Sequence, residues 1–416
     1  MANELLLTKN KDYWTFPSYR NKGINSIGDY PAMMVDAMQE ELIDSALHQI
    51  DNPKTLLDPF FGAGTTLIIA QKKNVLPIGI DINPLAHLIT YVKLYNYNVD
   101  AIKKSTASLF NQIEKNDTFE IFDFAGIDKW FRKDIIFDLS KIRAAITLEK
   151  DQNIRRFFWV AFAKIVRKYS NSRSSTFKLH IKDKDTISHM DNRIIDDFIR
   201  LVNENTSKIM VDYKKGDFTL YCGDSIAKLD HIENQSIDII CTSPPYGDNA
   251  TTVTYGQFST LQLRWIDSND LDISANVINC NNSSIDSKSL GGRNIYKQTD
   301  LLSINNFLKN ISEEKRAKVI NFMNDYQLVF DKMSSKLKNG GFLILTIGNR
   351  KVDNKSVPFD KANIELAQKN GLELLQRLSR KIVNKRMASK VSHLTNVGSV
   401  ESMKEEKVLI FVKKEK

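Results

Sequence analysis

The sequence predicts an α/β fold built on a parallel sheet, with a helical segment inserted into it. Short apolar runs alternate with helical patterns between residues 55 and 82, and such runs resume between residues 218 and 347. The intervening residues 101–215 show helical periodicity and polar connectors instead. A succession of strand, helix and strand favours parallel pairing, because the crossover helix returns the chain to the same edge of the sheet.

The elements follow one another in a clear order. A helix is expected at about residues 33–50, then a strand at 55–58, a glycine-bearing turn, a helix at 67–73 and a second strand at 75–82. Beyond the helical segment, strands are expected at 218–222, 237–242, 341–347 and 407–413. The polar stretch from residue 267 to 300 is expected to be a long mobile loop.

The composition indicates a soluble globular protein. Hydrophobic residues make up 42% and charged residues 26% of the 416 residues, and the formal net charge is +9. The length favours one large catalytic domain with an addition, and the absence of a long apolar run or signal-peptide pattern favours a cytoplasmic location. Neither the three cysteines nor the six histidines show the spacing of a zinc site or a disulfide framework, so no metal is expected.

The stretch DPFFGAGTT, residues 58–66, connects the first strand to its helix. Gly62 and Gly64 permit a tight turn and a close approach of a ligand to the backbone. Leu67 stands where the dinucleotide signature needs a third glycine, and the P-loop sequence is absent, so a nucleotide-like ligand without a pyrophosphate is favoured. Asp81 ends the second strand and suits the hydroxyls of a ribose. The alternatives are a purely structural turn and a helix-capping role for Asp81.

The stretch TSPPYGDN, residues 242–249, follows the strand at 237–242 and is the most specific element of the sequence. Two consecutive prolines fix the backbone, so the loop is stiff and its carbonyl groups can point at a bound group. Ser243 adds a hydroxyl and Tyr246 adds a flat aromatic face. This combination suits the binding of an amino group and stacking on the ring that carries it.

The two loops resemble those of the DNA amino-methyltransferases, which share a DPFxGxGT cofactor loop and a [DNS]-P-P-[YFW] catalytic loop. The SPPY variant is more typical of the N4-cytosine members than of the N6-adenine members. Gly223-Asp224 and Gly340-Gly341 also agree with the family pattern, and the resemblance covers about residues 26–95 and 216–355. The cofactor loop precedes the catalytic loop, which excludes the permuted branch of the family.

This resemblance implies a seven-stranded, Rossmann-like sheet with S-adenosylmethionine over the carboxyl ends of its strands. The expected domains are a cofactor-binding half at residues 1–100 and a catalytic half at 216–416, with a candidate target-recognition segment at 250–325. The basic helical insertion expected at 101–215 follows from the loss of the α/β pattern there, because the resemblance does not extend over it. The implied cofactor-binding residues are Tyr30, Pro31, Ala32, Asp58, Phe60, Gly62, Gly64, Thr65, Asp81 and Asp224. A capping role for Asp224 is an equal alternative on the local sequence.

The implied reaction is direct transfer of the methyl group to the N4 amine of a cytosine flipped out of duplex DNA. Ser243 and the carbonyl group of Pro244 are the candidate acceptors for the amine hydrogens, Pro245 stiffens the loop, and Tyr246 stacks on the base. Methylation of cytosine C5 is disfavoured because no Pro-Cys dipeptide supplies a nucleophile. N6-adenine methylation, RNA methylation and a catalytically inactive relative stay open as alternatives.

Two regions are candidates for DNA recognition. One is the segment with Arg293, Tyr296 and Lys297, expected to read bases, and the other is the basic insertion, expected to grip phosphates. The insertion arginines and lysines considered are Arg155, Arg156, Arg167, Lys168 and Arg173, with solvated helix faces as the alternative. The resemblance further implies a bacterial, nucleoid-associated enzyme with a cognate restriction endonuclease.

Overall fold

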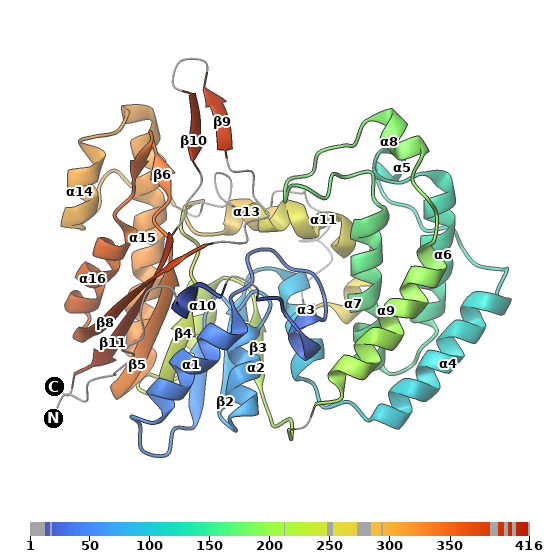
Figure 1. Ribbon diagram of the computed structural model, residues 1–416, viewed down its shortest axis with the longest axis horizontal. Coiled ribbons are helices and arrows are strands. Elements are labelled where there is room, and N and C mark those ends of the chain that lie inside the picture. Colours follow the sequence, from blue (N-terminus) through green and yellow to red (C-terminus); the bar gives the residue numbers. More distant parts are fainter. Residues whose placement is uncertain are drawn as a thin grey trace.

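The computed structural model describes residues 13–16, 19–211, 213–247, 253–272, 284–292, 294–382, 390–394, 398–401 and 405–414. Its centre is a seven-stranded sheet of order β3-β2-β1-β4-β5-β11-β8 (Figure 1). The strands are β1 Thr55–Asp58, β2 Leu76–Asp81, β3 Thr219–Cys222, β4 Ile237–Thr242, β5 Leu337–Ile347, β8 Leu372–Lys381 and β11 Glu405–Lys413. The strands β3, β2, β1, β4 and β5 pair in parallel, whereas β11 is antiparallel to both neighbours. The predicted seven-stranded α/β sheet is confirmed.

The sheet is buried on both faces, which explains the apolar runs in its strands. Consecutive residues of a strand enter opposite cores: Leu56 and Ile239 belong to one hydrophobic cluster, and Leu57 and Ile240 belong to the other. Helices cover each face because parallel strands require crossovers that pack back onto the sheet. These helices are α1 Asp36–Leu47, α2 Thr65–Lys72, α3 Pro84–Leu94, α10 Ser225–Lys228, α14 Leu302–Leu308, α15 Glu313–Lys336 and α16 Phe359–Lys369.

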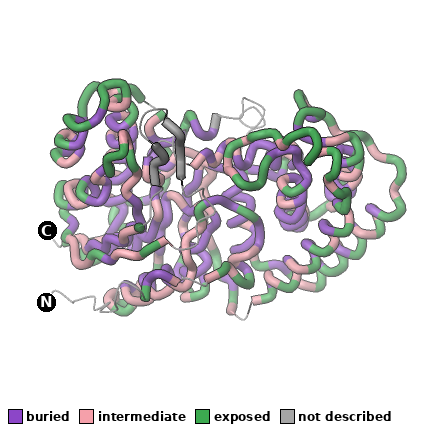
Figure 2. Tube along the Cα trace, turned by 45° about the horizontal axis from the view of Figure 1, so that its top comes forward, coloured by how far each residue is buried: buried purple, intermediate pink, exposed green. Residues whose placement is uncertain are grey.

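Residues 101–215 are helical as predicted, and they form the right-hand part of the molecule in Figure 1. The helices are α4 Val99–Lys115, α5 Ile127–Trp130, α6 Lys133–Thr147, α7 Gln152–Tyr169, α8 Lys184–Ser188 and α9 Ile194–Ile209. Helix α7 is the centre of this part, since Phe157, Phe158, Trp159 and Phe162 are all fully buried. Figure 2 shows that the interior of this part is buried, whereas its outer helices are more exposed.

The predicted strands at 55–58 and 237–242 match β1 and β4 residue for residue, and the other predicted strands differ only at their ends. The sequence analysis did not identify β8, the short hairpins β6 Lys351–Val352 with β7 Lys355–Ser356 and β9 Lys390–Leu394 with β10 Gly398–Glu401, or α14, α15 and α16. Short 3₁₀ turns lie at Tyr13–Thr15, Gly23–Ser26, Leu229–His231 and Ser268–Asp270. No helix in the described ranges is long and apolar enough to cross a membrane.

The stretch predicted to be one long loop from residue 267 to 300 is more structured than expected. It contains a 3₁₀ turn at Ser268–Asp270 and helix α13 at Ser284–Lys288, which lies beside α11 Tyr255–Trp265 in the upper middle of Figure 1. Residues 273–283 and Arg293 of this stretch lie outside the described residues.

Candidate active site

The glycine-bearing loop between β1 and α2 has the conformation that its sequence requires. Gly62 and Gly64 have φ angles of +50° and +77°, a region that side chains disfavour. A Cβ atom at Gly64 would lie 2.5 Å from Cγ2 of Thr90, so no larger residue fits there. Gly64 is also the N-cap of α2 and provides no side-chain cap, and Thr65 is buried in the first turn. The loop therefore offers backbone groups, rather than side chains, to a ligand.

Asp58 is fully buried and braces the loop from inside. Its carboxylate accepts hydrogen bonds from Oγ1 of Thr242 at 2.6 Å, from Oγ1 of Thr66 at 2.5 Å and from the backbone N–H of Phe60 at 3.0 Å. Burial raises the pKa of this carboxyl to about 6 against these donors. Asp58 thus joins the ends of β1 and β4 to α2, and half-buried Phe60 packs beside it against the second hydrophobic cluster.

Asp81 at the end of β2 points to the same loop. Its Oδ2 accepts the N–H of Gly62 at 2.9 Å, and its Oδ1 accepts the N–H of Asn83 at 2.8 Å. Asn83, not Asp81, caps α3, because the Asn83 side chain accepts the N–H of Leu85. Burial raises the pKa of Asp81 to about 6, with Asp58 contributing. A carboxylate with one backbone bond on each oxygen retains lone pairs that suit ribose hydroxyls.

The predicted N-terminal cofactor segment lies against the glycine loop. A Cβ atom at Gly62 would lie 3.3 Å from the ring of Tyr30, and Tyr30 stacks on Tyr255 with 5.6 Å between ring centroids. Pro31 is buried next to it, whereas Ala32 is exposed with a φ of +54°. Segments far apart in the sequence thus meet at one edge of the sheet.

Asp224 closes the cofactor side of the site. Its Oδ1 accepts the N–H of Ile226 at 2.8 Å and caps the short helix α10. The N–H of Gly223 donates to the carbonyl of Asp81 at 2.8 Å, so the ends of β2 and β3 are fixed together. The capping role therefore holds for Asp224, and its cofactor role stays a prediction.

The SPPY loop follows β4 and is stiffened as the prolines predict. Pro244 is buried, Ser243 and Pro245 are half-buried, and the Ser243 Oγ lies 3.1 Å from the hydroxyl of Tyr246. That hydroxyl also lies 3.5 Å from Oε1 of Glu406 on β11, and burial with the nearby Glu406 charge raises the pKa of Tyr246 well above its usual value. Because β1 pairs with both β2 and β4, this loop is the immediate neighbour of the glycine loop.

Several residues that shape this edge carry no motif of their own. The buried Asn83 side chain donates to the carbonyl of Tyr255 at 3.2 Å and to Oγ of Ser259 at 3.1 Å, which ties α3 to α11. Asp286 of α13 accepts the N–H groups of Gly256 and Gln257 at the start of α11. An asparagine after the strand-ending aspartate was the available sequence signal for the first contact. The contact of Asp286 with α11 joins segments about thirty residues apart, and no pattern in the sequence indicated it.

Lys93 of α3 is a buried cation beneath the glycine loop. Its Nζ donates to the carbonyl of Ala63 at 2.9 Å and to the carbonyl of Asn25 at 3.4 Å, with a side chain that is fully buried. Burial lowers its pKa to about 7. Lys93 therefore connects the loop to the N-terminal segment, a contact that the sequence analysis did not predict.

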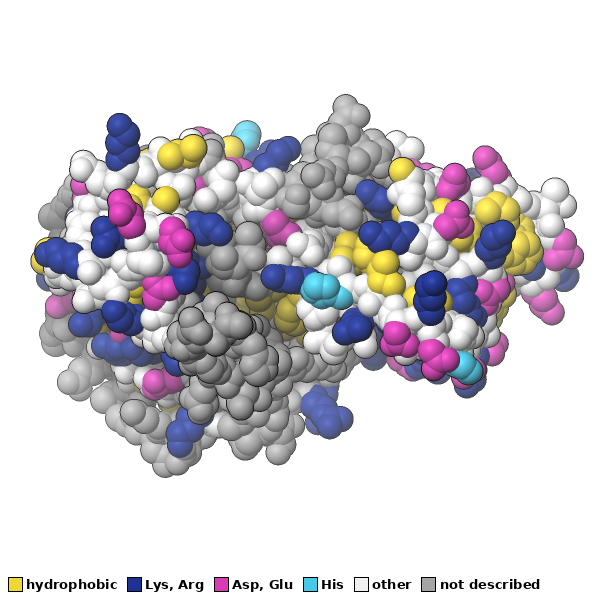
Figure 3. All heavy atoms as spheres, turned by 90° about the horizontal axis from the view of Figure 1, so that it is seen from above, with side chains coloured by type: hydrophobic (Ala, Val, Ile, Leu, Met, Phe, Trp, Pro, Cys, Tyr) yellow, Lys and Arg dark blue, Asp and Glu magenta, His cyan; other side chains and the backbone are white. Residues whose placement is uncertain are grey.

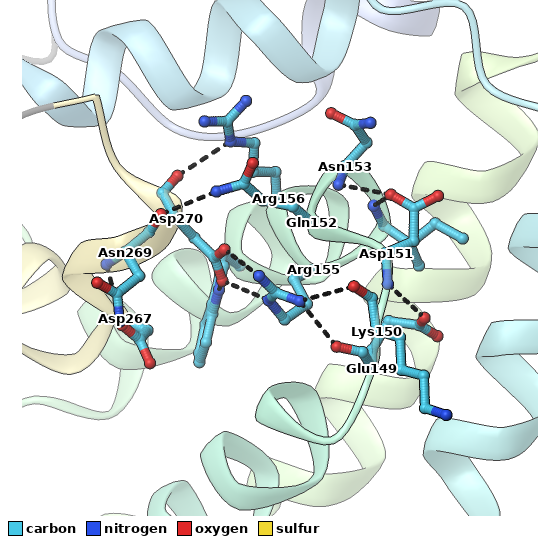
Figure 4. Close-up of polar contacts among 12 residues, drawn as sticks. Glu149, Lys150, Asp151, Gln152, Asn153, Arg155, Arg156, Asp267, Asn269 and Asp270 are labelled. Atoms are coloured by element: carbon cyan, nitrogen blue, oxygen red, sulfur yellow. Dashed lines mark hydrogen bonds and ion pairs between the residues drawn. The ribbon is translucent and has the colours of Figure 1, made fainter.

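The arginines of the insertion that were considered for phosphate binding are used inside the protein. Arg155 binds both oxygens of the buried Asp270 at 2.7 and 2.8 Å, as Figure 4 shows. Arg156 donates to the Asp270 carbonyl and contacts Asp272, and Lys168 pairs with Asp197. The guanidinium of Arg167 lies over the Phe258 ring, whereas Lys168 and Arg173 are exposed. The structure therefore favours a structural role for most of these residues.

Of the predicted base-reading residues, Tyr296 and Lys297 are described and Arg293 is not. The Tyr296 N–H donates to Asn321 Oδ1 at 2.8 Å and its hydroxyl to Asp325 Oδ1 at 3.3 Å, so this segment lies on α15 with Lys297 exposed. From above, Lys and Arg side chains are spread over both halves of the molecule among acidic ones (Figure 3). Within the described ranges, His, Cys, Asp and Glu nowhere gather into a group able to hold a metal ion.

Several known proteins are similar to this chain. Residues 6–92 match the family model N6_N4_Mtase, described as "DNA methylase". The chain is 29% identical over 398 residues to the Type II methyltransferase M.MvaI of Kocuria varians, covering 89% of this chain and 86% of that protein. It is 25% identical over 174 residues to the Type II methyltransferase M.MjaII of Methanocaldococcus jannaschii, which covers 40% of this chain and 32% of that protein. The solved structure of the rRNA methyltransferase aviRa from Streptomyces viridochromogenes is 10% identical in sequence and superposes with a TM-score of 0.33. The matched part covers 94% of this chain and 90% of that chain.

The matched domain contains the glycine loop and Asp81, and the similarity to M.MvaI extends over most of the chain. The sheet places that loop next to the SPPY loop, because β1 and β4 are paired. Residues 6–92 are therefore similar to DNA methylases, and most of the chain is similar to a Type II methyltransferase.

Proposed function

We propose that this protein methylates the N4 amine of a cytosine that is flipped out of double-stranded DNA at a specific site. The observation that carries the proposal is the half-buried Ser243 hydroxyl at the end of β4, next to the glycine loop. An exocyclic amine has its lone pair delocalised into the ring, so acceptors for its hydrogens help the nitrogen become tetrahedral. Ser243 Oγ and the carbonyl of Pro244 are the acceptors we assign.

The residues at the cofactor side fit S-adenosylmethionine. The two glycines keep the space over the loop free of side chains, and Asp81 supplies a carboxylate for the ribose hydroxyls. The uncapped first turn of α2 provides N–H groups, and Asp224 stands beside Asp81 for the adenine. When bound, the cofactor supplies an electrophilic methyl group on a sulfonium. Asp58 holds the loop in shape from inside, which we infer to be its main contribution.

We infer that Tyr246 stacks on the extruded base, because the target amine is otherwise locked in a base pair. Stacking of a base on an aromatic ring contributes roughly 1 to 3 kcal/mol in single-strand binders. The Tyr246 ring is held by hydrogen-bonding partners of its hydroxyl, which orients the ring before the base arrives. The prolines keep the loop from adapting to other shapes.

Target recognition and cellular context are part of the proposal. We infer that the segment around residues 281–297 discriminates bases, and that exposed basic residues such as Lys297 and Arg173 contribute phosphate contacts. Deletion of residues 281–297 that left the site preference intact would contradict the first part. The similarity to proteins named Type II methyltransferases supports a restriction-modification role. We further propose a cognate endonuclease and a bacterial, nucleoid-associated, cytoplasmic enzyme.

The test is to incubate the purified protein with duplex DNA and S-adenosylmethionine, digest the DNA to nucleosides and identify the methylated species by mass spectrometry. N4-methylcytosine is expected. N6-methyladenine would keep the cofactor and the loop chemistry but overturn the choice of base. An absence of methylated deoxynucleosides, with methylation of an RNA substrate in parallel, would overturn the DNA assignment.

A further inference from the structure

A charged pair from the last two strands of the sheet reaches the catalytic loop. Glu406 of β11 lies opposite Arg380 of β8 in the antiparallel register. Nε and Nη2 of Arg380 lie 2.7 and 2.6 Å from the same oxygen, Oε2 of Glu406. The other oxygen, Oε1, faces the Tyr246 hydroxyl at 3.5 Å, at the outer limit of a hydrogen bond. The side chains of Arg380 and Glu406 are only 11% and 17% exposed, so solvent screens them little.

This pair determines which way the hydrogen bonds in the loop can run. A carboxylate that is paired with an arginine accepts hydrogen bonds, so the Tyr246 hydroxyl directs its proton to Glu406. The tyrosine oxygen then accepts the proton of Ser243, whose Oγ lies 3.1 Å away. A serine hydroxyl has one proton and two lone pairs, so both lone pairs of Ser243 stay available to a group approaching the loop.

Without Glu406, the same two hydroxyls could pair in the opposite direction. Tyr246 would donate to Ser243 and occupy one of its lone pairs, and the Ser243 proton would be free to point outward. An exocyclic amine presents two N–H donors, so an outward hydroxyl proton would face donors and not stabilise them. The direction imposed by Glu406 keeps both lone pairs of Ser243 available to the amine and turns its proton toward Tyr246.

We propose that Glu406 and Arg380 are positioning residues that fix this hydrogen-bond direction and so keep Ser243 an acceptor for the target amine. The inference rests on the proposed amino-methyl transfer and adds two residues that lie outside both loop motifs. Glu406 acts only through the Tyr246 hydroxyl, so its contribution must vanish when that hydroxyl is absent. Neither residue contacts the glycine loop in the described contacts, so cofactor binding is expected to be independent of them.

The experiment is a double-mutant cycle on the full chain. Initial methylation rates are measured at saturating S-adenosylmethionine and DNA for Tyr246→Phe, Glu406→Gln and the double variant, with cofactor affinity measured by calorimetry. Each single variant is expected to lower kcat roughly tenfold, the size of one hydrogen bond in the transition state, without changing cofactor affinity. The double variant is expected to equal Tyr246→Phe. Glu405→Gln, on an exposed neighbour in β11, is the matched control and keeps the wild-type rate.

Losses that multiply in the double variant would overturn the proposal, as would a Glu406→Gln rate equal to that of Glu405→Gln. Tyr246→Phe leaves the charged pair untouched, so a lowered kcat at an unchanged melting temperature separates the chemistry from folding. A wild-type chain that methylates no DNA amine would overturn the proposed function itself. An active wild type with an unaffected Glu406→Gln would overturn only this inference.

Discussion

Lys93→Met is expected to stabilise the protein near neutral pH although it removes hydrogen bonds. The Lys93 side chain is 1% exposed, and burial lowers its pKa from 10.5 to about 7. Between these two values the unfolded chain binds a proton that the folded chain does not. The free energy of unfolding therefore rises with pH in this window, and below about pH 7 the cost of burying the charge is fully present.

The magnitude follows from the shift. One pKa unit corresponds to about 1.4 kcal/mol, so the ionised lysine costs roughly 5 kcal/mol at pH 7 and below. Methionine removes this cost but leaves the buried carbonyl of Ala63 without its donor, a loss of roughly 1 to 3 kcal/mol. The contact with the carbonyl of Asn25 is long, at 3.4 Å, and only part-buried, so its loss adds little. The variant is thus expected to gain stability at pH 7 and to lose that gain as the pH approaches 10.

Urea unfolding at fixed ionic strength from pH 7 to 10 measures this difference. The free energy of unfolding of the wild type is expected to rise, relative to that of Lys93→Met, by about 1.4 kcal/mol per pH unit. All other titrating groups are the same in the two chains, so their contributions cancel in this difference. Lys103→Met, on an exposed position of α4, controls for removal of a lysine as such. Wild-type and Lys93→Met curves that run parallel across this range would refute the reasoning.

Three further predictions test the site and its support. Ser243→Ala is expected to lower turnover far more than cofactor affinity, and single-turnover methylation with unchanged turnover would remove Ser243 from the mechanism. Asp81→Asn is expected to raise the cofactor Kd roughly tenfold. The cofactor affinity of the wild type is expected to fall as the pH drops through about 6, the pKa of Asp81. Equal cofactor affinities of the wild type and the variant in calorimetry would return Asp81 to a structural role. Arg155→Met leaves the buried Asp270 without its cation and is expected to lower the unfolding free energy by roughly 3 kcal/mol, against less than about 1 kcal/mol for the exposed Arg200→Met; equal effects in thermal unfolding would contradict this.

The predictable parts of the fold are those fixed by local chemistry. A strand buried on both faces needs a run of apolar residues, so β1 and β4 could be located to the residue. Gly64 could be placed in the turn because its left-handed backbone excludes other residues. Strand β8 escaped prediction because it is an edge strand with a half-exposed, polar pattern that resembles a loop.

The supporting residues of the site were less predictable, since their roles exist only after folding. Lys93 and Glu406 look like ordinary charged residues in the sequence, and only the packing of α3 and β11 gives them partners. Arg155 has the spacing of a solvated or nucleic-acid-facing residue, yet its partner lies more than a hundred residues away. Motifs identify the groups that touch ligands, whereas the residues that orient those groups come from tertiary contacts.

The place of β11 in the sheet has a consequence for the order of assembly. It follows all the other strands in the sequence, yet it lies between β5 and β8 and pairs with both. During synthesis, β5 and β8 thus emerge with unpaired edges, which are prone to wrong pairing until β11 is inserted. Glu406 arrives on that same strand, so its contact with the Tyr246 hydroxyl forms only after β11 has joined the sheet. The SPPY loop is therefore expected to reach its final arrangement late in folding.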